Sequence, residues 1–387
     1  MQCEKLFAII EDLYEDYIKI WKDICNIESP SDCKEGVDAV GAYIAAMARE
    51  RGWLVETLPQ PVSGDALCIT MNAEAEGRPV SLSGHMDTVH PLGLFGTPAV
   101  TEDTTYLYGP GVADCKGGIV VALLAMDALR LAGFTSRPVQ LLLQSDEEIG
   151  SSTSEKATID WICQKARDAV AFINLEPVLE GCEGRATLAR KGIADYRFEI
   201  TGVAAHSSRC ATDGASAIRE AAHKILELEK LKDVDGITCN CGVISGGTVP
   251  NAVAASCEFL ANFRFADMQQ LEQIEELVRR VAETVYVPGC TCMVEKTGSR
   301  PAMEWVPRNE ALLNAMNKIF RENGMTELVA RRVNGGADSA EVTLAGIPCV
   351  DSLGVVGGRI HSREEFGVQR SLAEQAKRVA AVVYSMV

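Results

Sequence analysis

Acidic residues and histidines follow three predicted strands at the points where those strands end. Five of them stand just after a strand: His85 and Asp87 after residues 79–83, Glu147 and Glu148 after 138–144, and Glu176 after 169–175. In an open α/β sheet, ligands bind outside the carboxyl ends of the strands, so we expect these side chains at one edge. So many like charges together are unfavourable unless a cation compensates them. The pattern therefore indicates a metal site.

The spacing within two of these groups suggests their roles. His85 and Asp87 are two residues apart, so in an extended segment both point to the same side, and Asp87 can accept a hydrogen bond from the imidazole nitrogen that does not bind metal. Glu147 and Glu148 are adjacent and face opposite ways, so one can bind metal while the other acts as general base on a metal-bound water. Each motif alone also has a simpler reading, a turn for the first and a solvated helix start for the second.

Two glycine-rich segments supply the remaining candidates for metal ligands. Asp114 has glycines on both sides, which let the backbone approach a site closely, and it stands just before a predicted helix over 117–133. Alone, Asp114 also fits a cap of that helix, and the glycines also fit phosphate binding, although their spacing matches neither a P-loop nor a dinucleotide fingerprint. His361 lies in a second glycine-rich turn, after a predicted strand over 348–353.

Composition excludes several classes of protein. The chain has 387 residues, of which 47% are hydrophobic and 24% charged, an ordinary soluble balance in a length sufficient for two domains. Its net charge of −17 argues against nucleic acid and anionic lipid as partners. The N-terminal segment 1–21 is acidic and predicts an amphipathic helix rather than a signal peptide, and no stretch reaches the roughly 18 apolar residues of a membrane span. We expect a cytoplasmic protein with reduced thiols.

The cysteines offer a second, weaker metal hypothesis. Fourteen cysteines are too dilute for a disulfide scaffold in a chain of this size. Two C-x-C pairs, Cys239 with Cys241 and Cys290 with Cys292, fall in predicted strands. Structural zinc sites prefer C-x2-C spacing, so we disfavour a zinc knuckle here.

The order of predicted elements changes twice along the chain. Up to residue 187, helices alternate with apolar β-rich runs, which predicts a mostly parallel central sheet flanked by helices. Over 188–295 the order becomes β-α-β-β-α-β, the ferredoxin-like order of a small α+β domain. Over 296–387 the alternation of helices with apolar β-rich runs returns. We therefore predict an α/β catalytic domain, formed by 1–187 and 296–387, with an α+β lid or dimerisation domain inserted at 188–295.

Seven strings of the sequence resemble the M20 metallopeptidase family, and most of all its carboxypeptidase G2 (glutamate carboxypeptidase) branch. In the family's order, and over nearly the whole chain, they are SGHMDTV, YGPGVADCKGG, SDEEIGS, INLEP, GIADYRFEITGVAAHS, GGADSA and SLG…GGRIHSREE. The fold of that family also has a catalytic α/β domain interrupted by a smaller lid or dimerisation domain. A homodimer formed through the inserted domain is part of what the resemblance implies.

The resemblance implies a particular pair of zinc sites. His85 and Glu176 would hold one Zn²⁺ and Glu148 and His361 the second, with Asp114 bridging the two. Such a donor set of histidine and carboxylate also tolerates Co²⁺ or Mn²⁺.

Further roles carry over from the family to single positions. Asp87 would orient the histidine at 85, Glu147 would be the general base and proton shuttle, and the peptide bond after the bridging aspartate is expected to be cis. In the inserted domain, His206 would stabilise the oxyanion, often from the partner subunit, while Asn251 and Arg264 would bind substrate. Arg264 suits a fork on a terminal carboxylate. Outside the family context these three fit a surface histidine, a turn asparagine and a strand arginine in a salt bridge.

The sequence departs from the usual family pattern in two places. Cys115 stands where another acid is common, and Ser207 and Ser208 follow His206 where many relatives have small residues such as Ala-Gly. Neither departure removes a metal ligand, but both leave the substrate preference open.

Together these features predict a di-zinc hydrolase that cleaves an amide bond next to a carboxylate-bearing residue. A glutamate-carboxypeptidase-like exopeptidase acting on a small peptide or an acyl-glutamate-like substrate is the first choice, and an N-acyl-amino-acid deacylase of the same family is the alternative. A non-catalytic binding protein on the same scaffold is a hypothesis from another class. It is disfavoured, because such a protein is expected to have lost a ligand or the general base, and every one is present.

Overall fold

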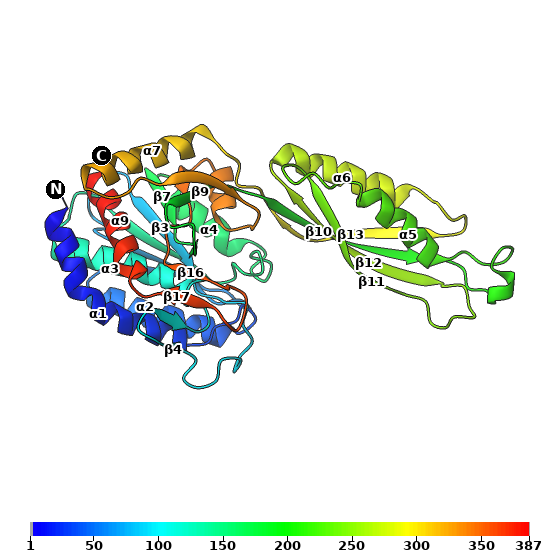
Figure 1. Cartoon of the computed structure of the whole chain (residues 1–387), viewed down its shortest axis with the longest axis horizontal. Coiled ribbons are helices and arrows are strands. Elements are labelled where there is room, and N and C mark those ends of the chain that lie inside the picture. The colour runs from blue at the N-terminus through cyan, green and yellow to red at the C-terminus, as the bar shows by residue number, and fades with distance from the viewer. Residues whose placement is uncertain (1–2, 387) are drawn as a thin grey trace. The chain divides into compact units, whose positions relative to one another are not determined.

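The chain folds into two compact units, described here from a computed structural model that covers residues 3–386 (Figure 1). The first unit comprises Met1–Leu188, Trp305–Arg332 and Ala337–Val387, and the second comprises Ala189–Glu304 and Val333–Gly336. We call them the α/β unit and the lid unit. The lid unit continues past the predicted boundary at 295 because its last strand pairs with a neighbour as far as Arg300.

The α/β unit is built on a six-stranded sheet. In spatial order its strands are β1 (Leu54–Leu58), β2 (Ala66–Met71), β6 (Val139–Gln144), β3 (Val80–His85), β7 (Ala171–Asn174) and β15 (Cys349–Val350). Pairing is parallel from β6 to β15 and antiparallel from β1 to β6. Every residue of β2, β3 and β7 is buried, so both faces of the sheet are covered, as near-continuous apolar runs predict. This confirms the predicted fold class.

Within the described residues 3–386, seven helices surround this sheet: α1 (Glu4–Asn26), α2 (Lys34–Glu50), α3 (Lys116–Leu131), α4 (Ala157–Ala166), α7 (Pro307–Glu322), α8 (Ser339–Leu344) and α9 (Ser371–Ser385). The predicted first helix corresponds to α1, although its first two residues lie outside the described ones. α3 is apolar nearly all round and packs against α1, α9 and β3. A helix apolar on every side belongs in the centre of a core. It begins directly after the glycine-rich segment that carries Asp114, so the core holds that segment in place.

Short strands complete the α/β unit. A five-stranded sheet has the order β4 (Thr101–Glu102), β5 (Tyr106–Tyr108), β17 (Phe366–Val368), β16 (Val356–Gly358) and β8 (Val178–Leu179), and a further pair joins β14 (Val329–Val333) to β9 (Arg185–Arg190). β16 and β17 pair antiparallel, and the turn between them carries His361. The strands of the five-stranded sheet were not predicted, because runs of two or three residues show no readable alternation.

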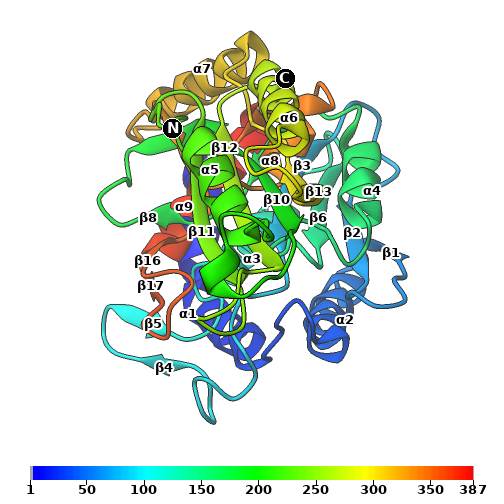
Figure 2. The same ribbon diagram turned by 90° about the vertical axis from the view of Figure 1, so that its right-hand side faces the viewer.

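The lid unit is a four-stranded antiparallel sheet with two helices. The strand order is β11 (Thr238–Gly246), β12 (Ser256–Phe265), β10 (Gly192–Thr201) and β13 (Thr291–Arg300). α5 (Ala217–Leu228) and α6 (Met268–Glu283) lie over one face, as Figure 2 shows. β10 and β12 alternate buried and exposed residues accordingly, and the stacked rings of Phe198 and Phe259 lie in the core. The element order is the predicted β-α-β-β-α-β.

The two C-x-C pairs lie at opposite edges of the lid sheet. Cys239 and Cys241 are on β11, whereas Cys290 and Cys292 are at β13, with two strands between. At about 4.8 Å per strand the pairs are roughly 14 Å apart, too far to share one ion. All fourteen cysteines are free thiols. Within residues 3–386 no helix is long and apolar enough to cross a bilayer.

Close packing of α3 against the strand before Glu176 gives a first testable prediction. A Cβ on Gly118 would lie 2.0 Å from the backbone oxygen of Leu175, which cannot move without moving β7. We expect Gly118→Ala to lower the free energy of unfolding by about 1–3 kcal/mol, measured by urea denaturation. Gly184→Ala is the control, because its Cβ meets nothing within 4 Å. Equal unfolding midpoints for the two variants would contradict this packing.

Candidate metal centre

His85 closes β3 with its ring held in one orientation. The imidazole is buried, and its Nδ1 lies 3.0 Å from the backbone oxygen of Asp87 and 3.4 Å from that residue's Oδ1. Because both neighbours are oxygen atoms, Nδ1 carries the proton and donates it. The other nitrogen, Nε2, lies 3.0 Å from Asp114 Oδ1. This is the arrangement in which a histidine presents a ring nitrogen to a metal ion.

Asp114 divides its two carboxylate oxygens between two histidines. Its Oδ1 faces His85, and its Oδ2 lies 3.2 Å from His361 Nε2. Each histidine also has a carboxylate of its own: Glu176 Oε1 is 3.8 Å from the His85 nitrogen, and Glu148 Oε2 is 3.2 Å from the His361 nitrogen. The structure thus brings together all five predicted ligands, as two histidine–carboxylate pairs that share Asp114.

These groups perturb one another's ionisation strongly. Burial raises the pKa of Glu148 to about 7. Hydrogen bonds to Asp114 and Glu148 raise the pKa of His361 to about 10. Burial acts to raise the pKa of Asp114, but hydrogen bonds from His361 and His85 outweigh it and leave that pKa low. The positive charge of the protonated histidines compensates the negative charge of the acids at this edge. Divalent cations would compensate that charge in the same way.

The donor set fits a metal ion on geometry as well. Ligand atoms of His85, Asp114 and Glu148 all lie within 4.8 Å of one another. A second group with the same property contains His85, Glu176 and Cys115. Nitrogen and oxygen donors of this kind suit zinc.

Asp87 links the ends of two strands. Its carboxylate accepts the backbone N–H of Glu147 and of Glu148, each at 3.1 Å, and the hydroxyl of Ser31 at 2.7 Å. It is fully buried, which acts to raise its pKa, but its hydrogen bond with His85 leads the contacts that lower it overall. Asp87 therefore orients a predicted ligand and also fixes the backbone that carries the predicted general base. Glu147 is itself buried at this edge.

The segment before α3 has the expected backbone, but Asp114 is not a helix cap. The Asp114–Cys115 peptide bond is cis. The N-cap residue of α3 is Cys115, whose side chain makes no capping hydrogen bond. Its thiol donates to the backbone oxygen of Leu175 at 3.1 Å. The position of Cys115 beside His85 was not predicted, although its place in the sequence, where relatives often carry an acid, was a signal.

The three predicted substrate-binding residues all lie in the lid unit. His206 Nδ1 accepts the N–H of Ser208 at 3.3 Å, and the backbone oxygen of Asn251 accepts the N–H of the residue after His206 at 3.0 Å. These two predicted residues therefore stand on adjoining loops. Arg264 is on β12, where it donates to the Asn262 side chain at 3.2 Å, and burial lowers its pKa.

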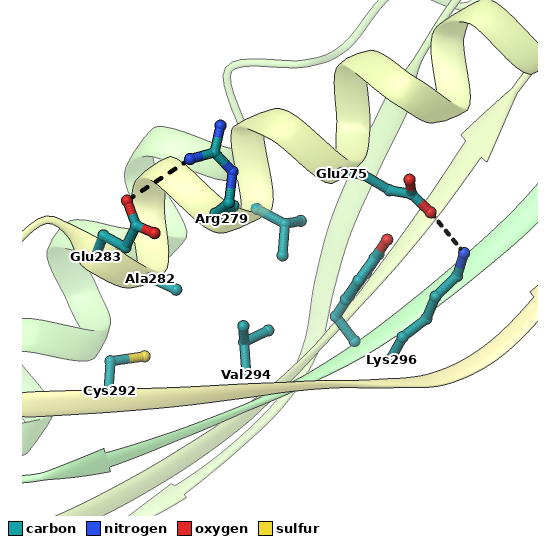
Figure 3. A pocket seen from close by; sticks show the side chains of 9 residues that line it. Glu275, Arg279, Ala282, Glu283, Cys292, Val294 and Lys296 are labelled. Atoms are coloured by element: carbon teal, nitrogen blue, oxygen red, sulfur yellow. Dashed lines mark hydrogen bonds and ion pairs between the residues drawn. The ribbon is translucent and has the colours of Figure 1, made fainter.

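A separate cavity of about 470 Å³ lies in the lid unit between α6 and β13 (Figure 3). Its charged residues pair with one another: Glu275 lies 2.9 Å from Lys296, and Arg279 lies 3.9 Å from Glu283. No histidine lines it. Its acids are thus neutralised by neighbouring side chains, so this cavity does not call for a cation.

Comparison with known proteins agrees with this fold. Residues 188–290 match the model of the peptidase dimerisation domain of M20 proteins. The chain is 29% identical over 361 residues to carboxypeptidase G2 from Pseudomonas sp. (strain RS-16), covering 92% of this chain and 86% of that one. It is 31% identical over 221 residues to acetylornithine deacetylase from Myxococcus xanthus, 53% of this chain and 54% of that one. An M20 family metallo-carboxypeptidase from Sulfolobus solfataricus shares the fold, with a TM-score of 0.73, 17% identity, and coverage of 95% and 98%.

The chain is thus a hydrolase with the two-unit architecture of metallopeptidases. Along most of its length it is similar to carboxypeptidase G2, and its residues 188–290 match the dimerisation domain of M20 peptidases.

The raised pKa of His361 predicts proton-coupled metal binding. A histidine held protonated by Asp114 and Glu148 must lose its proton before it can bind a cation. We expect the apparent affinity for Zn²⁺ to rise with pH as far as about pH 10, the raised pKa, because protonation of His361 competes with the metal below it. Isothermal titration calorimetry in buffers of different ionisation enthalpy measures the released protons. An affinity that does not change with pH would contradict the assignment of His361 as a ligand.

Proposed function

We propose that this chain is a di-zinc exopeptidase of the glutamate-carboxypeptidase type. Its substrate is a small peptide or acyl amino acid, cut at the amide bond on the amino side of a carboxylate-bearing residue. The observation that carries the proposal is Asp114, whose two oxygens face His85 and His361. A shared carboxylate between two histidine–carboxylate pairs is the donor set of a two-metal hydrolytic site.

In this proposal, His85 and Glu176 would hold one ion, Glu148 and His361 would hold the other, and Asp114 would contribute a carboxylate oxygen to each. When bound, the two ions supply Lewis-acid polarisation of the amide carbonyl and lower the pKa of a water molecule. Co²⁺ or Mn²⁺ could replace zinc with these ligands.

Glu147 is the proposed proton carrier. Its backbone N–H is fixed by Asp87, next to the N–H of Glu148, so a proposed ligand and a proposed base share one rigid turn. The carboxylate takes a proton from the attacking water and returns it to the leaving amine, which makes one residue both base and acid. Asp87 keeps the ring of His85 in the orientation that binds metal.

The lid residues are proposed to bind substrate. Because Nδ1 of His206 accepts a backbone N–H, the proton of the neutral ring is on Nε2, which leaves a donor for the oxyanion. Arg264 offers a planar fork for the terminal carboxylate of the substrate, and Asn251 adds an amide beside the loop of His206.

An N-acyl-amino-acid deacylase is the second candidate function, because acetylornithine deacetylase from Myxococcus xanthus is 31% identical over about half of this chain. Both reactions break an amide bond beside a carboxylate and use the same site. A panel of dipeptides, acyl-glutamates and acetyl-amino acids, assayed for kcat/KM with zinc, separates them.

We also propose a homodimer formed through the lid unit and a cytoplasmic location. The dimerisation-domain match covers most of that unit. The edge strand β11 exposes Val243 and Ile244, each more than half accessible, as an unpaired edge that meets a second copy would. Fourteen free thiols suit a reducing compartment.

Replacing the proposed general base should separate chemistry from metal binding. We expect Glu147→Ala to retain both ions while kcat falls roughly 10²–10⁴-fold. Metal content by elemental analysis and steady-state kinetics measure the two effects. Glu148→Ala is the comparison, because it removes a proposed ligand and should lose metal as well as activity. If Glu147→Ala turns over substrate as fast as the wild type, the assignment of the base is wrong.

Removing the proposed carboxylate fork should affect binding of substrate more than turnover. We expect Arg264→Gln to raise KM about 10–100-fold for substrates with a free terminal carboxylate, because a charged hydrogen bond is lost. Amidated substrates should show no such change. Arg197→Gln is the matched control, since Arg197 is a strand arginine of the same sheet that pairs with Glu295. Equal KM values for both variants would refute the role of Arg264.

A further inference from the structure

One buried carboxylate, that of Glu365, contacts the segment that carries Asp114. Its Oε1 accepts the backbone N–H of Ala113 at 2.9 Å and of Asp114 at 3.0 Å, and its Oε2 accepts the N–H of Gly111 at 3.3 Å. The residue has no exposed surface. Three backbone donors that would otherwise be buried without an acceptor are therefore satisfied by a single side chain.

The same carboxylate also contacts His90. His90 Nε2 lies 2.7 Å from Glu365 Oε2, and because the acceptor is a carboxylate, this nitrogen donates. The imidazole is buried and packs edge-on against the ring of Phe95, with the centroids 5.0 Å apart. A hydrogen bond and an aromatic contact thus hold His90 in place, so it in turn limits the rotation of the Glu365 side chain.

These contacts join three loops, each of which carries a proposed ligand. His90 lies on the loop that continues from His85, and Glu365 lies at the end of the turn that carries His361. The third loop is that of Asp114 itself. The single carboxylate of Glu365 therefore ties together the backbones that present the two histidines and the carboxylate they share.

We propose that Glu365, held by His90, is a positioning residue that sets how Asp114 divides its oxygens between the two metal positions. The Asp114 N–H donates to Glu365, so the direction of the Asp114 side chain depends on that contact. Without it, the segment before α3 can rotate and one oxygen moves away from its histidine. Groups behind the ligands tune metal affinity in this way, typically by roughly 10–100-fold.

The lid unit contains a matched carboxylate for comparison. Glu220 is also buried, and its Oε2 accepts the backbone N–H of Tyr286 at 2.9 Å and of Val287 at 2.6 Å. It pairs with the buried Lys224 at 3.0 Å. Glu220 belongs to the same class of interaction as Glu365, but it has no proposed ligand among its partners. Substitution of Glu220 therefore measures the effect on stability of losing such a contact, without any effect on the proposed ligands.

The proposal rests on the proposed metal centre, and one set of variants tests both. Wild type, Glu365→Ala, Glu365→Gln, His90→Gln and Glu220→Gln are compared by chelator competition with Zn²⁺ and by the visible absorption spectrum with Co²⁺. Melting of the metal-free proteins measures the structural cost separately. For Glu365→Ala we expect an affinity for at least one ion about 10–100-fold lower and an altered Co²⁺ spectrum. Glu365→Gln keeps one acceptor oxygen and should therefore lose less metal affinity than Glu365→Ala.

The remaining outcomes decide the proposal as well. Glu220→Gln should melt earlier yet keep wild-type affinity and spectrum. If Glu365→Ala does not fold, the His90→Gln variant tests the proposal instead. It leaves Glu365 intact and should still lower the affinity for one of the two ions. If the Glu365 and His90 variants keep the wild-type Zn²⁺ affinity and Co²⁺ spectrum, the positioning role is wrong. The proposal of a di-zinc hydrolase would not be affected by that result. A wild-type protein that binds two ions but hydrolyses no acyl amino acid would overturn the proposed function alone, and one that binds no metal would overturn both.

Discussion

Three carboxylates and two imidazoles meet at the carboxyl edge of one sheet, and most of these groups are sheltered from water. Like charges at such distances repel strongly in a medium of low dielectric constant, so they can stay together only if positive charge lies among them. In the structure the histidines take that role by holding protons, as the raised pKa of His361 shows. We propose divalent ions in their place. The rest of the α/β unit holds these mutually repelling groups in one geometry.

Support for the site comes from carboxylates behind the ligands as much as from the hydrophobic core. Asp87 accepts the backbone N–H groups of Glu147 and Glu148, and Glu365 accepts those of the Asp114 segment. Each fixes a loop by satisfying buried backbone donors, which the apolar core cannot do. α3, apolar on nearly every side, anchors the same segment from behind. The positions of the ligand-bearing loops thus depend on buried polar contacts. The hydrophobic core supplies the overall stability of the unit.

Much of the site could be predicted because its signals are local. Strands buried on both faces appear as apolar runs, and the residues after them, such as His85, Glu148 and Glu176, must reach the same edge. The contact between His90 and Glu365 could not be predicted, because it joins residues far apart in sequence and neither lies in a local pattern. The strands β16 and β17, which place His361 and Glu365, are too short for periodicity to reveal them. Cys115 gave a signal by its position in the sequence, but only the fold shows that its thiol lies near His85 and Glu176.

The central claim is that Asp114 binds two metal ions, one on the side of His85 and one on the side of His361. Crystals of the zinc-loaded protein, measured on both sides of the zinc absorption edge, test this most directly. The account predicts two anomalous peaks, each next to one oxygen of Asp114, with Glu176 at the first and Glu148 at the second. A single peak, or two peaks that do not share Asp114, would contradict it.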